Sequence, residues 1–128
     1  MLITRRVEFS ASHVCRQADP DAPENRPHGH NFVAEVTLSG RPDPVTGMVF
    51  DLKKLKGILN REVAEPYDHR FLNHEVPPFD SVVPTPENIA RDIWRRLEPH
   101  FSTGDPRLHS VRLYETDDLF VDYDGEDS

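Results

Sequence analysis

Residues 28–40 read HGHNFVAEVTLSG, and the regular alternation of their side chains indicates how the chain folds. One set of alternate positions is mostly apolar and the other mostly polar, as in a half-buried β-strand. Residues 2–13, LITRRVEFSASH, alternate in the same way, with Arg5 as the exception. We therefore predict two strands that share one buried face. That face carries Ile3, Val7, Phe9, Ala11 and His13 on the first strand, and His28, His30, Phe32, Ala34, Val36 and Leu38 on the second.

The remainder of the chain predicts two helices and a closing pair of strands. Asp51 is a suitable N-cap for a helix that runs to Pro66, and Thr85 followed by a proline begins a second helix. Between them lies a proline-rich loop, 67–84, and loops of that length in compact domains usually carry function. Strands are expected over residues 107–116 and 119–124. This order predicts an α+β fold of two layers, with the helices on one face of an antiparallel sheet.

Size and charge restrict the functional classes. The 128 residues fit a single domain, 1–128, and the net charge of -8 argues against nonspecific nucleic-acid binding, which needs a basic surface. The single cysteine, Cys15, excludes an intrachain disulfide. No apolar run approaches the roughly 20 residues of a membrane-spanning helix. We expect a cytoplasmic protein that binds neither nucleic acids nor membranes.

The histidines at positions 28 and 30 are candidate metal ligands. Successive residues on one face of a strand lie about 6.6–6.8 Å apart. Two imidazoles at that separation can converge on one zinc ion, with Zn–N near 2.0–2.1 Å. If the first two strands form a hairpin, His13 lies beside His28 and His30. Three histidines with an open fourth position are typical of a catalytic zinc site, whereas the alternative is three ordinary histidines at the end of a sheet.

Three further residues are candidates for catalysis or substrate binding. Asp68 and His69 could form an oriented acid–base pair, although an ion pair at a helix end explains the same dipeptide. Glu115 lies at the end of a buried strand face, where a carboxylate needs a partner. That partner is either an arginine, such as Arg112 or Arg91, or the N–H groups of a bound ring.

Five motifs together resemble the 6-pyruvoyl-tetrahydropterin synthase family, which includes 6-carboxytetrahydropterin synthase. In chain order these are FSASH, HGHNF, YDHRFLN, TPENIARDIWRRL and YET, spread over nearly the whole sequence. The resemblance implies a tunnelling fold (T-fold), in which a four-stranded antiparallel sheet carries two helices on one face. It implies that the sheets of several subunits form β-barrels, typically in a homo-hexamer of two stacked trimers. Active sites then lie at the subunit interfaces.

The resemblance also assigns roles to residues. Glu115 is implied to bind the pterin substrate by accepting hydrogen bonds from the ring N–H and amino group. Asp68 and His69 match the acid–base pair of the family. The implied ligands of the Zn2+ cofactor are His13, His28 and His30.

The sequence departs from the family pattern at Glu24, four residues before His28. Members that make pyruvoyl- or carboxy-tetrahydropterin carry a catalytic cysteine there, and Cys15 lies nine residues earlier. A glutamate at this position is similar to the subgroup that converts 7,8-dihydroneopterin triphosphate to 6-hydroxymethyl-7,8-dihydropterin, a folate precursor. Glu24 would take a hydroxyl proton made acidic by zinc, and this drives cleavage of the side chain. The alternative is a solvated loop acid beside Arg26.

We therefore predict a zinc-dependent lyase that cleaves the side chain of 7,8-dihydroneopterin triphosphate. One alternative is a 6-pyruvoyl- or 6-carboxy-tetrahydropterin synthase of the biopterin or queuosine route, with Cys15 as a possible nucleophile or fourth ligand. Two others are a non-catalytic pterin-binding relative and a zinc hydrolase of an unrelated substrate. Candidate cations for the triphosphate are Arg16, Arg26, Lys53 and Lys54.

Overall fold

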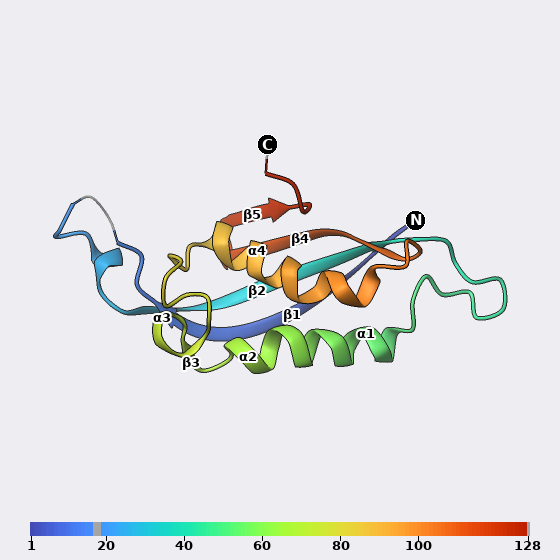
Figure 1. The fold of residues 1–128 in the computed structure, drawn as a ribbon, viewed down its shortest axis with the longest axis horizontal. Coiled ribbons are helices and arrows are strands. Elements are labelled where there is room, and N and C mark those ends of the chain that lie inside the picture. Colours follow the sequence, from blue (N-terminus) through green and yellow to red (C-terminus); the bar gives the residue numbers. More distant parts are fainter. Residues whose placement is uncertain (17–18, 128) are drawn as a thin grey trace.

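The computed structural model describes residues 1–16 and 19–127, and its centre is a long antiparallel hairpin (Figure 1). Strands β1 (Leu2–His13) and β2 (His28–Ser39) pair along their whole length. The register places His13 opposite His28 and Ala11 opposite His30. The alternation of the sequence thus puts all three histidines on one face and at one end of the sheet.

The sheet contains five strands in the order β3-β1-β2-β4-β5. Strands β4 (Arg107–Thr116) and β5 (Leu119–Tyr123) form the closing hairpin that the sequence predicts. The fifth strand, β3 (Arg70–Phe71), corrects the four-stranded prediction, because it pairs in parallel with β1 from within the expected loop. A strand of two residues has no alternation that a sequence could reveal.

Both long helical segments begin at the residues that their caps predict. Helix α1 (Leu52–Leu59) starts after Asp51, whose carboxylate accepts hydrogen bonds from two backbone N–H groups. A π-helical turn (Asn60–Ala64) and α2 (Glu65–Tyr67) continue it. Helix α4 (Pro86–Leu97) starts after Thr85, whose hydroxyl oxygen accepts a hydrogen bond from the third helical N–H. Short elements complete the chain: 3₁₀ turns at Pro23–Asn25 and Glu98–Phe101, and α3 (Leu72–Glu75).

The core lies between one face of the sheet and the helices that cover it (Figure 1). The apolar positions of β1, β2 and β4 face the buried stripes of α1 and α4 in a single cluster. His13 continues this buried face and is 0% exposed. No helix in the described part of the chain has the length and apolar character needed to cross a membrane.

The segment between the helices folds back against α4. Tyr67 is fully buried and donates a hydrogen bond from its hydroxyl to Asp92. Arg96 donates to the same carboxylate at 2.8 Å and to the carbonyl oxygen of Pro77 at 3.3 Å. These contacts hold the beginning and the middle of the segment against α4. Asp68 and Pro84, from the same segment, contact Ser10 and His13 of β1.

Candidate metal centre and active site

Three histidines converge where β1 ends and β2 begins. The ring centroids of His13 and His28 are 4.4 Å apart, and that of His30 lies 5.3 Å from the first and 5.1 Å from the second. This proximity follows from the register of the hairpin, which sets His13 directly across from His28. The structure therefore brings together the three residues that the sequence proposes as metal ligands.

The backbone fixes which nitrogen two of these rings present. The Nδ1 of His13 lies 2.7 Å from the carbonyl oxygen of Pro84, and that of His28 lies 2.9 Å from the carbonyl oxygen of Arg26. A carbonyl can only accept, so each Nδ1 carries the proton and each Nε2 keeps its lone pair. This is the usual way in which proteins orient histidine ligands.

The environment of His13 suits a metal. Burial lowers its pKa, although the hydrogen bond to Pro84 acts in the opposite direction, so the ring stays neutral and able to bind. Its Nε2 is buried and has no hydrogen-bond partner within the described residues. An orphaned buried lone pair is costly, and a cation beside it would remove that cost. The donor set therefore fits Zn2+, for which neutral imidazoles are common ligands.

The carboxylate of Glu115 lies next to the imidazole rings of the histidine cluster. One of its carboxylate oxygens, Oε1, is 3.3 Å from the Nε2 of His13 and 3.5 Å from the Nε2 of His30. The ligand atoms of these four residues all lie within 4.8 Å of one another. The arginines proposed as partners of this carboxylate are elsewhere, because Arg112 pairs with Asp122 and Arg91 with Asp127. The alternative in which Arg112 or Arg91 pairs with Glu115 was therefore wrong.

Asp68 and His69 contact each other but stand apart from the histidine cluster. The Oδ1 of Asp68 is 3.2 Å from the Nδ1 of His69 and accepts a hydrogen bond from the backbone N–H of Ser10 at 2.8 Å. His69 adopts φ of 61° and donates its own N–H to the carbonyl oxygen of Ser10. The imidazole is 80% exposed, so within one chain it faces solvent.

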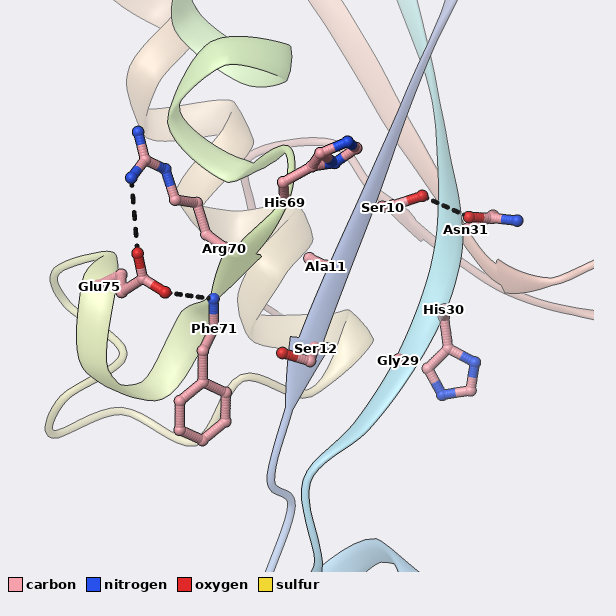
Figure 2. A pocket seen from close by; sticks show the side chains of 10 residues that line it. All are labelled: Ser10, Ala11, Ser12, Gly29, His30, Asn31, His69, Arg70, Phe71 and Glu75. Atoms are coloured by element: carbon pink, nitrogen blue, oxygen red, sulfur yellow. Dashed lines mark hydrogen bonds and ion pairs between the residues drawn. The ribbon is translucent and has the colours of Figure 1, made fainter.

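A surface hollow of about 520 Å³ borders both groups. Figure 2 shows His69 beside Ser10 at one edge of β1 and His30 beyond β2. Gly29 also lines the hollow, next to His30 on β2 and on the face of the strand opposite the core. Polar groups from β1, β2, β3 and α3 line the remainder of the hollow.

Glu24 lies in the 3₁₀ turn that leads into β2. Its side chain is exposed, while its backbone carbonyl accepts a hydrogen bond from the N–H of Cys15 at 2.8 Å. Cys15 itself is buried, with its sulfur 3.4 Å from the Nδ1 of His13. Burial, together with the charges of Glu115 and Glu24, raises the pKa of this thiol to about 11. The thiol is therefore protonated at neutral pH.

Asn73 is a structural partner of this site that sequence reasoning missed. Its side-chain oxygen accepts from the N–H of Val14 at 2.8 Å, and its amide donates to the carbonyl oxygen of Val14 at 3.1 Å. Val14 lies between the ligand His13 and the buried Cys15. The only signal in the sequence was the position of this asparagine at the end of the YDHRFLN motif.

The chain matches the model of the 6-pyruvoyl tetrahydropterin synthase family over residues 2–126. It belongs to that family. It is 40% identical to the 6-pyruvoyl tetrahydrobiopterin synthase of Pongo abelii, over 97% of this chain and 91% of the relative. A solved Caenorhabditis elegans 6-pyruvoyl tetrahydropterin synthase is 33% identical with a TM-score of 0.85, over 98% of this chain and 96% of that one.

A more distant solved structure shows the same fold. It is a Plasmodium vivax 6-pyruvoyltetrahydropterin synthase in which a catalytic glutamate has been replaced by alanine. Its TM-score is 0.64 at 18% identity, with 96% of this chain and 97% of that one covered. The recognised family and its α+β T-fold are thus confirmed for this chain. The hexamer remains a prediction.

Family membership bears on the predicted reaction as well. It identifies the protein as a pterin-synthase-family lyase, and the relatives named above are pyruvoyl-forming synthases. These findings agree better with the alternative, a tetrahydropterin synthase, than with the side-chain cleavage that we predicted from Glu24. Nothing in them singles out the folate or the queuosine route.

Four cations were considered for the triphosphate, and one of them, Arg26, is exposed at the end of the 3₁₀ turn Pro23–Asn25. Lys53 and Lys54 begin α1, at the opposite end of the sheet from the histidines (Figure 1). Arg16 lies three residues after the end of β1 and lines a hollow of about 500 Å³ together with Asn25 and His74. Within one chain, Arg16 is therefore better placed than the two lysines.

Proposed function

We propose that this protein is a zinc-dependent lyase that acts on 7,8-dihydroneopterin triphosphate and forms 6-pyruvoyl-tetrahydropterin with loss of triphosphate. The main support is the buried Nε2 of His13, which lies in a cluster of three histidines and has no hydrogen-bond partner among the described residues. The chain also matches pyruvoyl-forming synthases along its length. The atoms balance without an external oxidant, because the double bond of the dihydropterin ring is reduced while the side chain is oxidised.

His13, His28 and His30 would hold the metal through their Nε2 atoms. The hydrogen bonds to the carbonyl oxygens of Pro84 and Arg26 support this assignment, since they leave those nitrogens unprotonated. When bound, zinc would supply Lewis acidity that makes the side-chain hydroxyls of the substrate easier to deprotonate.

Glu115 would bind the pterin ring, and Asp68 and His69 would carry protons. A carboxylate can accept two hydrogen bonds from adjacent N–H groups, which suits the donor edge of a pterin. The contact between Asp68 and the Nδ1 of His69 would orient the imidazole with its other nitrogen toward the substrate.

The exposure of His69 supports an active site shared between subunits. An acid–base group that is 80% exposed exchanges protons with water, whereas catalysis favours an enclosed site. We therefore propose that a neighbouring copy covers this imidazole in a homo-hexamer, as the family resemblance implies. The analytical ultracentrifuge would test this, because a monomer at micromolar concentration would contradict it.

Side-chain cleavage to 6-hydroxymethyl-7,8-dihydropterin is a second candidate. It is favoured by Glu24 at the position where the family resemblance places a cysteine. Here Glu24 would take the proton of the hydroxyl on the second side-chain carbon, and the bond between the first two side-chain carbons would break. The electron pair of that bond would pass into the ring system and be protonated at the first carbon, and the other two carbons would leave as glycolaldehyde triphosphate. The buried, protonated Cys15 is a poor base for either reaction, which favours Glu24 as the proton acceptor in both.

The deciding experiment incubates the zinc-loaded protein with 7,8-dihydroneopterin triphosphate and identifies the product by mass. We expect 6-pyruvoyl-tetrahydropterin together with free triphosphate. 6-Hydroxymethyl-7,8-dihydropterin would establish the second candidate instead, and 6-carboxytetrahydropterin would assign the queuosine-type reaction. Absence of all three products would overturn the proposed function.

Variants of Glu24 test its role directly. We expect Glu24→Gln to lose at least about a hundredfold in kcat, the usual contribution of a general base. The matched control is Asp21→Asn, which removes an exposed carboxylate from the same segment and should leave turnover unchanged. Full turnover by Glu24→Gln would show that Glu24 is a solvated surface acid and not the general base.

A further inference from the structure

We propose that a buried, charged cluster on α4 positions the turn that carries Asp68 and His69. The members of this Asp92 cluster are Asp92, Tyr67, Arg95 and Arg96. They lie outside the group of candidate metal ligands and outside the hollow that borders His69. Only the chemical role of Asp68 and His69 rests on the proposed function, because the way in which the turn is held does not depend on any substrate.

The turn needs support from outside its own sequence. His69 adopts φ of 61°, in the left-handed region, where a residue that carries a Cβ is strained. Strained residues persist only where the surrounding structure over-determines their conformation. The flanking elements are short, since α2 ends at Tyr67 and β3 contains only Arg70 and Phe71. The turn is therefore held by tertiary contacts.

One set of contacts comes from the backbone of Ser10 on β1. Its N–H donates to the carboxylate of Asp68 at 2.8 Å, and its carbonyl oxygen accepts the N–H of His69. The neighbouring residue of β1, Phe9, points to the opposite face and into the core. The turn thus contacts β1 at a point whose other side is covered by buried residues.

Tyr67, directly before the acid–base pair, joins that buried side to α4. Its ring is fully buried and lies 5.0 Å from the ring of Phe9 between centroids. Its hydroxyl donates a hydrogen bond to the carboxylate of Asp92. Burial and the charge of Asp92 raise the pKa of this phenol, so that it keeps its proton and stays a donor. The chain therefore enters the turn from a side chain that is tied to both the strand and the helix.

Two arginines keep the carboxylate of Asp92 aimed at the phenol. Arg96 donates from Nε at 2.8 Å to Oδ2, the same oxygen that accepts the hydroxyl of Tyr67, while Arg95 binds Oδ1. The guanidinium of Arg96 also lies over the ring of Tyr67, 5.2 Å from its centroid. Because both oxygens are occupied, the carboxylate is fixed in orientation, and the phenol that binds it is fixed as well.

A contribution to stability alone does not explain a charged cluster at this place. Charges are costly to bury, and apolar side chains of similar volume often give an equal or greater free energy of unfolding. Charged hydrogen bonds supply direction, because they weaken steeply when the donor and acceptor are misaligned. The Asp92 cluster thus fixes the position of Tyr67 and, through the peptide bond that follows, the position of Asp68.

Removal of one hydroxyl group tests the positioning with little change in packing. Tyr67→Phe is compared with the wild type and with Tyr123→Phe, which alters a half-buried ring beside Trp94. We expect Tyr67→Phe to lower kcat with 7,8-dihydroneopterin triphosphate at least about tenfold, because a shift of about 1 Å in a catalytic group is costly. Tyr123→Phe should turn over like the wild type.

The pattern of the kinetic change separates positioning from general damage. All three proteins are assayed well below their unfolding temperatures. In Tyr67→Phe the KM should change by less than about twofold, and the zinc affinity in chelator competition should not change, since other residues bind the substrate and the metal. Equal kcat in the wild type and Tyr67→Phe would overturn the proposal. A loss of kcat accompanied by weaker zinc binding would also overturn it.

Amide exchange tests the turn without any substrate. In protein that is isotope-labelled only at its histidines, NMR follows the N–H of His69, which binds the carbonyl of Ser10, and that of His109 on β4. We expect exchange at His69 to be at least about tenfold faster in Tyr67→Phe, with His109 unchanged. Equal rates at His69, or faster exchange at both histidines, would overturn the positioning. If the wild type turned over no substrate but exchange at His69 alone accelerated, the proposed function would fail and the positioning of the turn would stand.

Discussion

Asn73 holds Val14 through two hydrogen bonds, one to its N–H at 2.8 Å and one from its amide to the carbonyl at 3.1 Å. The contact joins the segment between the helices to the residue that directly follows the proposed ligand His13. It links parts of the chain that are 59 residues apart in sequence. A side chain outside the candidate ligand set therefore holds the backbone next to His13.

We predict that Asn73→Ala lowers the free energy of unfolding by about 1–3 kcal/mol, the sum of two hydrogen bonds to partly buried backbone groups. It should also weaken zinc binding, because the end of β1 loses its support. Urea denaturation and chelator competition measure the two effects. Asn60→Ala, at an exposed helical position, serves as the control and should change stability by less than about 0.5 kcal/mol. Unchanged zinc affinity in Asn73→Ala would show that the ligands are held without this contact.

Cys15 should react slowly with alkylating reagents. Because burial raises the pKa of this thiol from 9.0 to about 11, little thiolate exists at pH 8. Iodoacetamide labelling of the folded protein at pH 8, followed by mass spectrometry, should be much slower than labelling of the urea-unfolded chain. Cys15→Ser should retain turnover. Rapid labelling in the folded state would instead reveal a reactive thiolate beside the metal centre.

From the raised pKa of the same thiol we predict that the protein loses stability at alkaline pH. Its folded-state pKa lies above the unfolded value, so between pH 9.0 and about 11 the folded chain binds more protons than the unfolded chain. The contribution of Cys15 to stability is therefore complete below pH 9.0 and is lost as pH rises toward 11. In Cys15→Ala the loss of stability that this thiol causes between pH 9.0 and about 11 should disappear. Parallel unfolding curves of both proteins across this range would contradict the prediction.

Asp92 should be among the most sensitive positions of the core. Its carboxylate is 2% exposed and accepts hydrogen bonds from the buried Tyr67 and from Arg96. Asp92→Ala would leave a phenol and a guanidinium without their acceptor, and we expect a loss of about 3 kcal/mol. Arg95→Ala is the control, because Arg95 binds the same carboxylate but is 65% exposed and should contribute less than about 1 kcal/mol. Similar losses in both variants, measured by thermal denaturation, would refute a role for burial.

Gly57 offers a stabilising substitution. It lies inside α1, and a Cβ added there meets no atom within 4 Å. Gly57→Ala should raise the free energy of unfolding by about 0.5–1 kcal/mol, because alanine loses less backbone entropy on folding. Gly104→Ala is the contrast, since Gly104 also has open space but adopts φ of 98°, where alanine is strained. Destabilisation by Gly57→Ala would mean that the helix is distorted at this turn.

Several features could be predicted from the sequence because they depend on local patterns. The alternation of β1 and β2 indicated which residues face the core, and with the hairpin it placed His13 beside His28 and His30. The N-caps Asp51 and Thr85 marked the starts of both long helices. Such signals are read over a few residues, where backbone hydrogen bonding and hydrophobic periodicity act.

Other features arise only when distant segments meet. Strand β3 exists because residues 70–71 find the free edge of β1, and Asn73 acts on Val14 only after the chain has folded back. Glu115 lies where the β4–β5 register shifts, and the arginine partners that the sequence suggested for it bind other acids. Local sequence thus determined the strands β1, β2, β4 and β5, the starts of the two long helices and the choice of the three histidines. Only tertiary packing decided that the carboxylate of Glu115 lies beside them, because this contact joins residues more than a hundred apart in the chain, such as His13 and Glu115.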